Sequence, residues 1–365
     1  MKRKIWVKIL LAMLISSLLL AGCNGQPAAN SGTNTVSAPQ TEPTTRTVTD
    51  AYGRNVVIPA KIERILPVYS YSVVSSFLHL FGEGDKIACG LPTSFSPDTY
   101  KYLPIFAPQV SNLPSLTNST SDTPNFEAML NLNPDLCFAV TEAQVQALEE
   151  KNFTTVGLSI RHYEEFRNNI RVLGDVFDKQ DIATRYLKYL EDTLAMIKER
   201  VDTIPEEERV RVLYFDKQRM CRPNVIGEWW ITAAGGVSVT ADQGEKAVEM
   251  NLESIISKNP DVIIEMLHSN AIDIYADKDW AGIKAVQDKR VYSVPVGSHF
   301  LSNWTSEEPI FMIWVATKFY PELFSDINVV EEFKNFYKEY FNYELTTEQA
   351  EDIITSDRDY YARRP

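Results

Sequence analysis

The chain has 365 residues, of which 49 are acidic and 36 are lysine or arginine, so its formal net charge at pH 7 is −13. Such an acidic surface argues against binding to nucleic acid and against electrostatic attachment to anionic lipid. The four cysteines show no CxxC spacing, which excludes a recognisable disulfide framework or zinc site.

The first 22 residues have the pattern of a signal peptide. Lysine and arginine at positions 2, 3, 4 and 8 precede an apolar stretch over residues 9–20. A transmembrane anchor is the alternative, but the stretch is short and runs into Leu20-Ala21-Gly22-Cys23. This ending resembles a bacterial lipobox, which implies cleavage before Cys23 and diacylglycerol on its sulfur, with palmitate among the acyl chains. Such acyl chains would anchor the protein to the extracytoplasmic face of the membrane.

The remaining chain divides into five predicted parts. Residues 23–46 contain no aromatic residue, so we expect the lipidated Cys23 to be followed by a flexible tether with an r.m.s. span of about 25 Å. We expect the folded parts to be an N-terminal α/β lobe over 47–162, a spine helix over 163–202, a C-terminal α/β lobe over 203–345, and a C-terminal helix and tail over 346–365.

The first lobe begins with elements that alternate between strand and helix. Residues 48–58 predict a β-hairpin that turns at residues 50–54, and residues 62–68 and 87–91 predict strands. A helix is expected over residues 73–81, ended by Gly82. This alternation is typical of a parallel sheet covered by helices.

One sequence segment occurs twice. Residues 125–136 (NFEAMLNLNPDL) recur as residues 251–262 (NLESIISKNPDV), with five of twelve positions identical. In each copy an Asn caps a short helix, a Glu sits in its first turn, and an Asn before Pro ends it. An apolar run follows, which predicts a buried parallel strand. Because the copies lie 126 residues apart, they indicate one similar lobe each, with a cleft between the lobes.

The region between the two copies predicts a long amphipathic helix over residues 163–202, with a possible interruption near Gly174 or Asp178. Its apolar positions repeat every three or four residues: Ala183, Leu187, Leu190, Leu194, Ile197 and Val201. We expect this helix to join the lobes and to restrict hinge closure.

The second lobe follows the same pattern. We expect strands over residues 209–215 and 290–296, and helices over residues 229–234, 309–320, 329–341 and from 346 onward. The predicted fold is therefore α/β, with two Rossmann-like lobes that contain parallel central sheets and are joined by a single long α-helix.

Six segments then resemble one known family. They are residues 47–54, residues 82–87, the paired Asn-Pro-Asp segments at 133–135 and 259–261, residues 169–174, residues 234–236 and residues 320–324. In this order they resemble the substrate-binding lipoproteins of bacterial ABC importers, of the helix-spined class III that serves ferric siderophores, haem and cobalamin. The resemblance implies a ligand held between the lobes, and a monomer whose partners are a permease dimer and its ATPase.

The resemblance also implies one surface glutamate in each lobe that pairs with arginines of the permease. In the second lobe, Ser306-Glu307-Glu308-Pro309 matches this pattern, which makes Glu307 the expected docking carboxylate. The alternative for Glu307 is a solvated carboxylate favoured by the helix dipole. In the first lobe the aligned position is Ser76, and the nearby Glu83 is the expected substitute.

Ligands of open α/β sheets bind beyond the carboxyl ends of the strands. The candidate ligand-binding residues at these positions are Tyr69, Tyr71, Thr141, Glu142, Arg219, Arg222, His268, His299, Phe300 and Trp304, with Trp230 as a possible pocket wall. Arg219 and Arg222 are the most specific pair, because two guanidinium groups in one loop suit an anionic ligand. Their alternative is an ordinary exposed loop.

The other candidates also have structural alternatives. Aromatic rings could stack on a macrocycle or line a chelate pocket, or they could simply belong to the core. His268 and His299 could bind the metal of a ligand through imidazole, although a lone His is more often structural. No metal or cofactor is expected to belong to the protein itself.

These features favour capture of a metal chelate for import, with a ferric siderophore as the first candidate. Haem, a corrinoid, or molybdate or tungstate are the alternatives in the same role. An enzyme such as a chelatase is disfavoured, since the chain has no GxSxG, HExxH, P-loop or GxGxxG motif. A tethered receptor that signals to a sensor protein stays open, as does a Gram-positive surface versus a periplasmic location.

Overall fold

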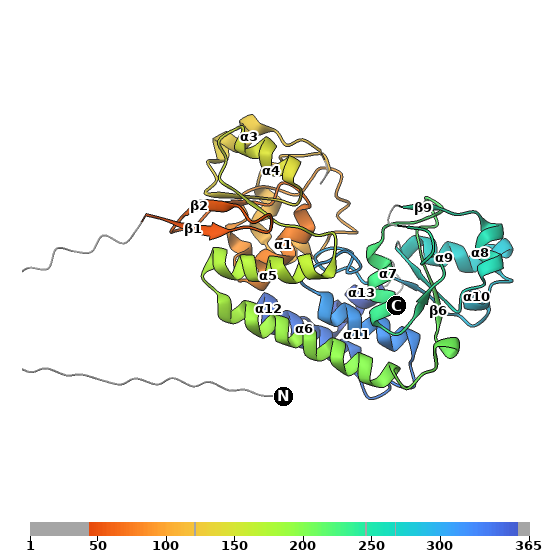
Figure 1. Cartoon of the computed structure of the whole chain (residues 1–365). Helices are drawn as coiled ribbons and strands as arrows, with labels where there is room; N and C mark the ends of the chain where they lie inside the picture. The colour runs from red at the N-terminus through yellow and green to blue at the C-terminus, as the bar shows by residue number, and fades with distance from the viewer. Residues whose placement is uncertain (1–43, 120–121, 245–246, 267, 357–365) are drawn as a thin grey trace, which may run out of the picture. The chain divides into compact units, whose positions relative to one another are not determined.

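The computed structural model describes residues 44–119, 122–244, 247–266 and 268–356, except for the side chains of residues 268–270 (Figure 1). The predicted signal peptide, Cys23, most of the tether and residues 357–365 lie outside this part. Within it, no helix combines the length and apolar character needed to cross a membrane.

The first lobe contains an antiparallel hairpin and a small parallel sheet. The predicted hairpin is confirmed, and the sheet has the strand order β3-β4-β5. The expected strand over residues 87–91 is reduced to isolated bridges at Ile87 and Gly90. The elements are β1 Thr45–Thr49, β2 Asn55–Pro59, β3 Ile65–Leu66, α1 Tyr71–Leu80, η1 Gly84–Lys86, α2 Leu103–Phe106, η2 Pro108–Asn112, α3 Phe126–Leu132, β4 Leu136–Ala139, α4 Glu142–Glu149 and β5 Thr155–Gly157.

The second lobe contains a four-stranded parallel sheet in the order β11-β10-β6-β8, and a separate antiparallel pair, β7 and β9. Its elements are η3 Glu206–Glu208, β6 Arg211–Phe215, β7 Cys221–Arg222, α7 Ile226–Ala233, β8 Val237–Ser238, β9 Val248–Glu249, α8 Leu252–Lys258, β10 Val262–Glu265, α9 His268–Ala276, η4 Lys278–Trp280, α10 Lys284–Gln287 and β11 Val291–Ser293. Both lobes are thus α/β, as predicted.

The duplicated segment forms the same unit in both lobes. Asn125 Oδ1 accepts a hydrogen bond from Ala128 N at 3.0 Å, and Asn251 Oδ1 accepts one from Ser254 N at 2.8 Å. Both helices end at an Asn with left-handed backbone, with φ of 45° at Asn133 and 41° at Asn259. The cap and the stop predicted from sequence are therefore confirmed.

The aspartate after each Asn-Pro pair forms hydrogen bonds with the backbone at the start of the neighbouring strand in the sheet. Asp135 Oδ2 accepts hydrogen bonds from the backbone N–H groups of Glu63 at 2.7 Å and Arg64 at 2.9 Å, just before β3. Asp261 Oδ2 accepts one from Arg211 N at 2.9 Å, at the start of β6. Each unit thereby sets the position of β4 or β10 beside its neighbouring strand.

The region expected to be one spine helix contains two helices, α5 Tyr163–Phe177 and α6 Gln180–Val201. The chain breaks at Asp178, whose φ of 55° is left-handed, and α6 then packs back against α5. The two helices approach closely at Gly174, where a Cβ atom would lie 2.9 Å from Ala183 Cβ. The helix that connects the lobes is therefore α6, with 22 residues.

The last helices are α11 Glu308–Phe319, α12 Val329–Phe341 and α13 Thr347–Thr355. Helix α12 contacts α1 of the first lobe, and the ring of Phe341 stacks on His79 with 5.2 Å between centroids. The aromatic face of α12 thus packs against the first lobe, and the expected boundary at residue 345 stays a prediction. Helices α5, α6, α11 and α12 form one layer beneath the sheets (Figure 1).

Candidate ligand site between the lobes

Three predicted residues follow the strand ends of the first lobe. Tyr69 lies beyond β3 and is buried, with burial raising the pKa of its phenol. Thr141 and Glu142 lie beyond β4 and are exposed; Thr141 Oγ1 caps α4 by accepting a hydrogen bond from Gln144 N at 3.2 Å. Thr141 and Glu142 are therefore accessible at the edge of the sheet, whereas Tyr69 is covered. Contact of these three residues with a ligand stays a prediction.

A group of aromatic residues crosses from one lobe to the other. The ring of Tyr100 stacks on Phe95 with 3.9 Å between centroids, and on His299 with 5.8 Å. Tyr71 meets the edge of Phe95, and Phe300 meets the edge of Tyr100, each with 6.2 Å between centroids. We call these five residues the aromatic column. Residues 71, 95 and 100 belong to the first lobe, whereas 299 and 300 follow β11 of the second.

Phe95 and Tyr100 were missed by the sequence analysis, because they lie in the irregular segment 92–102 and not directly after a strand. The signal in the sequence is weak: aromatic residues in a Ser- and Pro-containing loop. Tyr71 is the buried member of the column on the side of α1. Its ring contacts Phe95, and its hydroxyl donates a hydrogen bond to Cys89 O at 3.1 Å.

His299 has a neutral imidazole with one nitrogen that is unpaired among the described residues, as a ligand-binding histidine would. Burial lowers the pKa of its imidazole to about 4, so the ring is neutral at pH 7. Its Nδ1 is buried and has no hydrogen-bond partner among the described residues, while Nε2 lies 3.4 Å from Asn303 Nδ2. A neutral imidazole can bind a metal or exchange hydrogen bonds with an anion, depending on its tautomer.

The predicted pair of arginines is not formed. Arg219 is available, because its side chain is 74% exposed and its Nε lies 3.6 Å from Asp216 Oδ2. Arg222 instead lies in β7 and is fully buried, with Nη1 at 2.7 Å from Glu228 Oε1. A buried guanidinium is costly unless it is paired, and Glu228 in the first turn of α7 supplies the opposite charge. The expectation that Arg222 faces a ligand is therefore wrong in this structure.

Two predicted tryptophans belong to the packing and not to a pocket wall. Trp230 is fully buried and meets Tyr214 edge-to-face, with 5.1 Å between centroids. Trp304 is buried against Phe166 of α5 at 5.4 Å and against Trp229 at 4.7 Å, which joins α5 to α7. The expected ligand contacts of Trp230 and Trp304 are corrected accordingly. The side chain of His268 lies outside the described residues.

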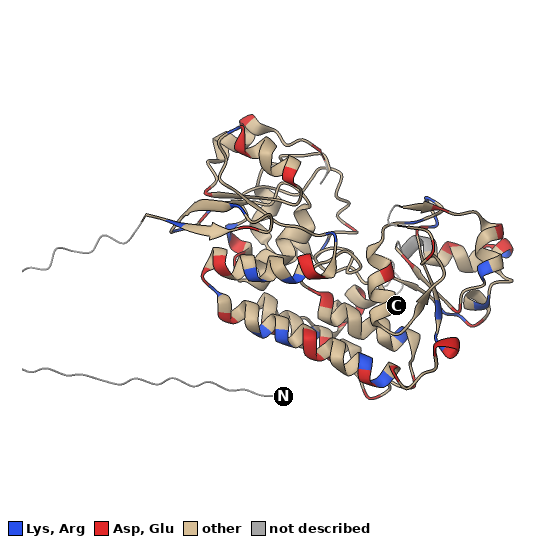
Figure 2. Cartoon of the chain, viewed as in Figure 1, with Lys and Arg blue, Asp and Glu red and all other residues tan. Residues whose placement is uncertain are grey.

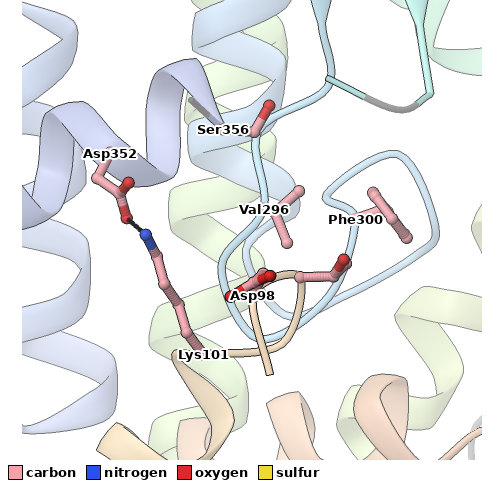
Figure 3. Close-up of a pocket in the computed structure, with 7 residues that line it drawn as sticks. Asp98, Lys101, Val296, Phe300, Asp352 and Ser356 are labelled. Atoms are coloured by element: carbon pink, nitrogen blue, oxygen red, sulfur yellow. Dashed lines mark ion pairs between the residues drawn. The ribbon is translucent and has the colours of Figure 1, made fainter. Parts of the chain in front are cut away.

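Phe300 is buried and lines a small cavity of about 20 Å³. The other residues around this cavity are Asp98, Thr99, Lys101, Val296, Asp352 and Ser356. Figure 3 shows that Lys101 of the first lobe reaches across to the carboxylate of Asp352 in α13, at 2.5 Å. The cavity therefore lies where the first lobe, the loop after β11 and the C-terminal helix meet.

Both expected docking glutamates are buried. Glu307 accepts hydrogen bonds from Ser298 N at 2.8 Å, Ser298 Oγ at 2.7 Å and Tyr337 Oη at 2.9 Å. Glu83 is paired with Lys86 and Lys179, each at 2.5 Å. Because neither offers a surface carboxylate, both docking predictions are contradicted by this structure.

Ser76, the position aligned with the first-lobe docking residue, is also internal. Its Oγ accepts a hydrogen bond from Ser306 N at 2.9 Å, and its carbonyl accepts one from Ser306 Oγ at 2.8 Å. Ser76 and Ser306 therefore fasten α1 to the segment before α11.

The duplicated segment carries a pair of exposed glutamates that the sequence analysis did not select. Glu127 and Glu253 occupy the same position in the two copies, in the first turns of α3 and α8, and both are exposed. Three residues later, Leu130 is 59% exposed and Ile256 is 45% exposed. Figure 2 shows acidic residues on both helices. The signal that could have found these residues is the repeat itself.

This architecture matches that of known proteins. A family model described as periplasmic binding protein matches residues 68–296. The chain belongs to this family. A crystal structure of a periplasmic solute binding protein from Veillonella parvula, 26% identical, superposes with a TM-score of 0.73 and covers 87% of this chain and 99% of that one.

Two curated relatives extend over most of the chain. The molybdate-binding protein MolA of Haemophilus influenzae is 22% identical over 334 residues, which covers 81% of this chain and 91% of the relative. The uncharacterised ABC transporter substrate-binding lipoprotein YvrC of Bacillus subtilis is 25% identical over 298 residues, covering 78% of this chain and 88% of the relative. The resemblance to ABC importer binding proteins and the predicted fold class are confirmed.

The general role follows from family membership. The protein is an extracytoplasmic substrate-binding protein of an ABC transporter, and not an enzyme. Its ligand is the small molecule that is transported, and its partners are a permease and the ATPase of that permease.

Proposed function

We propose that the protein captures an anionic metal chelate, with a ferric siderophore as the first candidate, between its two lobes. The observation that carries this proposal is the aromatic column, which combines flat apolar rings with the neutral imidazole of His299 at the junction of the lobes. Aromatic rings suit the organic body of a chelate, and imidazole suits its metal. The exposed Arg219 adds a donor for negative charge.

Molybdate is the second candidate. One observation favours it: the similarity to a relative named for molybdate binding. A tetrahedral oxyanion would require hydrogen-bond donors such as Arg219 and the protonated nitrogen of His299, and it would make little use of the aromatic rings. Tungstate would bind in the same way.

A ligand panel tests the two candidates directly. Purified protein is titrated with ferric catecholate, hydroxamate and carboxylate siderophores, haem, cobalamin, molybdate and tungstate, and tryptophan fluorescence and calorimetry report binding. We expect a ferric siderophore to bind more tightly than the others. Binding of molybdate alone would establish the second candidate, and binding of haem or cobalamin alone would replace both.

The variant Arg219→Ala tests the role of charge in the same assay. Since a hydrogen bond to a charged group contributes about 1.5–3 kcal/mol, we expect affinity for an anionic chelate to fall roughly tenfold to hundredfold. Arg185→Ala is the matched control, because Arg185 is an exposed arginine on α6. Equal affinity of Arg219→Ala and wild type would remove Arg219 from the site.

We propose further that Glu127 and Glu253 are the docking carboxylates for the permease. The resemblance implies one surface glutamate in each lobe, and these two occupy equivalent positions in the duplicated units. Neither has an ion pair or a side-chain hydrogen bond among the described residues. The neighbouring Leu130 and Ile256 add an apolar contact to each charge, as is typical of an interface.

We also propose that a lipid is attached to Cys23. It is supported by the Leu20-Ala21-Gly22-Cys23 ending and by the similarity to the lipoprotein YvrC. The expected result is that cells incorporate a labelled palmitate analogue into the wild-type protein and not into Cys23→Ser. Equal labelling of the two proteins would contradict lipidation at this residue.

A further inference from the structure

Helix α13 is hydrogen-bonded to residues adjacent in sequence to both sides of the aromatic column. On the side of the first lobe, Tyr102 Oη donates a hydrogen bond to Asp352 Oδ2 at 2.7 Å and lies 3.1 Å from Gln349 O. On the side of the second lobe, Val296 N donates to Ile353 O at 3.0 Å. Tyr102 lies two residues after Tyr100, and Val296 lies three residues before His299. Adjacent residues of one helix therefore hold the two segments that carry the stacked rings.

Asp352 is the centre of this arrangement. Its side chain is buried, and its Oδ2 receives both Lys101 Nζ at 2.5 Å and Tyr102 Oη at 2.7 Å (Figure 3). These partners follow Tyr100 directly in sequence. Because a buried carboxylate with two charge-assisted or hydroxyl donors has a well-defined geometry, it fixes the end of segment 92–102 relative to α13.

The helix that carries Asp352 is itself firmly placed. Thr346 and Gln349 form a reciprocal capping box at its start, with Thr346 Oγ1 accepting from Gln349 N at 3.2 Å. The side chain of Gln349 also donates to Tyr343 Oη at 3.0 Å. Asp352 is therefore presented by a short but well-capped helix.

The second oxygen of Asp352 does not take part in these contacts. Asp352 Oδ1 and Ser356 Oγ are buried and have no hydrogen-bond partner among the described residues, and both residues line the cavity of about 20 Å³ beside Phe300. This volume accommodates about one water molecule. Asp352 and Phe300 of the column therefore line the same cavity.

We propose that Asp352 is a positioning residue for ligand binding: by holding Lys101 and Tyr102, it keeps Tyr100 stacked between Phe95 and His299. The inference rests on the proposed function, since the aromatic column is the proposed ligand site. It assigns to the C-terminal helix a part in ligand binding, although α13 lies far in sequence from the strand ends.

The first experiment needs no ligand. Hydrogen–deuterium exchange is measured by mass spectrometry on wild type, Asp352→Asn, Lys101→Met and Glu339→Gln. Glu339 is an exposed carboxylate of α12, so its variant makes the same charge change away from the column. We expect exchange over residues 92–102 to be about tenfold faster in Asp352→Asn and in Lys101→Met, and unchanged in Glu339→Gln. If Asp352→Asn does not fold, Lys101→Met still tests the proposal, because it removes the other partner of the same ion pair.

The second experiment measures the dissociation rate of whichever probe binds wild type in the panel, a ferric siderophore or molybdate. We expect this rate to be about tenfold faster in Asp352→Asn, with little further change in the double variant with Lys101→Met, because both substitutions remove the same Lys101–Asp352 ion pair. Unchanged exchange over residues 92–102, or an unchanged dissociation rate, would overturn the proposal. A wild-type protein that binds no probe contradicts the proposed function alone, because the exchange result stands without a ligand.

Discussion

Glu308 lies at the start of α11, in the interior of the protein. It is fully buried, neither of its carboxyl oxygens has a hydrogen-bond partner among the described residues, and it lies next to the equally buried Glu307. Burial first, and the charge of Glu307 second, raise the pKa of Glu308 well above its ordinary value. Glu308 therefore tends to remain protonated when an exposed glutamate has already ionised.

This shift predicts a pH-dependent effect of Glu308→Gln. Below the pKa of the unfolded chain, Glu308 is protonated in both states and contributes no penalty. As the pH rises above that value, the unfolded state ionises first, so wild-type stability falls until the pKa of the folded state is reached. We expect Glu308→Gln to unfold at a higher temperature than wild type at pH 7–8, by roughly 2–4 °C for each 1 kcal/mol gained, and to lose this advantage near pH 4.

Thermal unfolding followed by circular dichroism between pH 4 and pH 8 checks this expectation. Glu331→Gln on the exposed start of α12 is the control, and it should show no such trend. A gain in Glu308→Gln that is the same at pH 4 and pH 8 would point to altered packing and would refute the ionisation argument.

Single-residue roles were predicted least well, for a physical reason. Arg222 does follow strand β6, and Glu307 does precede helix α11, as expected from the sequence. Whether these side chains are exposed depends on the residues that pack against them, which the sequence pattern does not reveal. Glu228 neutralises Arg222, and Tyr337, thirty residues further along the chain, donates to Glu307. Adjacent tryptophans differ in the same way: Trp230 faces the core, whereas Trp229 is only partly buried.

At the scale of elements, local chemistry was a better guide. The capped helix and buried strand of each duplicated unit were predicted in full, because Asn caps and an Asn-Pro stop act within a few residues. The spine was predicted as one element with an open interruption, and its break lies at Asp178. The prediction of a regular strand over residues 87–91 was wrong, since only Ile87 and Gly90 form isolated β-bridges there.

The aspartates of the duplicated units provide an element-scale prediction. Asp135→Ala removes an acceptor for two backbone N–H groups before β3, and Asp261→Ala removes one at the start of β6. We expect each substitution to lower the free energy of unfolding by about 1.5–3 kcal/mol, measured by urea denaturation. Asp192→Ala is the control, because its ion pair with Lys188 on α6 is exposed. Asp135→Ala or Asp261→Ala as stable as Asp192→Ala would contradict this role.

At the scale of the whole molecule, the duplication predicts how the protein meets its permease. We expect Glu127→Lys and Glu253→Lys each to weaken docking about fivefold, and the double variant to abolish most of it, because like charges would then face the permease arginines. Ligand affinity should not change. The measurement is stimulation of ATP hydrolysis by the permease complex in lipid vesicles, with Glu206→Lys as an exposed control. Full stimulation by the double variant would exclude these residues from the interface.

The two-lobed plan itself could be predicted from the repeat, the alternation of strands and helices, and the family resemblance. The return of the chain to the first lobe could not, because the contact of α12 with α1 joins segments about 250 residues apart. The aromatic column was missed for the same reason: it joins residues of the segment 92–102 with His299 and Phe300.

The return of α12 has a consequence for biogenesis. The rings of His79 and Phe106 are covered by Phe341, near the end of the chain, so the N-terminal half cannot complete its core while synthesis is under way. A nascent chain that lacks its last helices retains an incomplete apolar surface, which delays stable folding. Such a delay is compatible with passage through a narrow translocation channel, after which the late helices close the structure outside the cytoplasm.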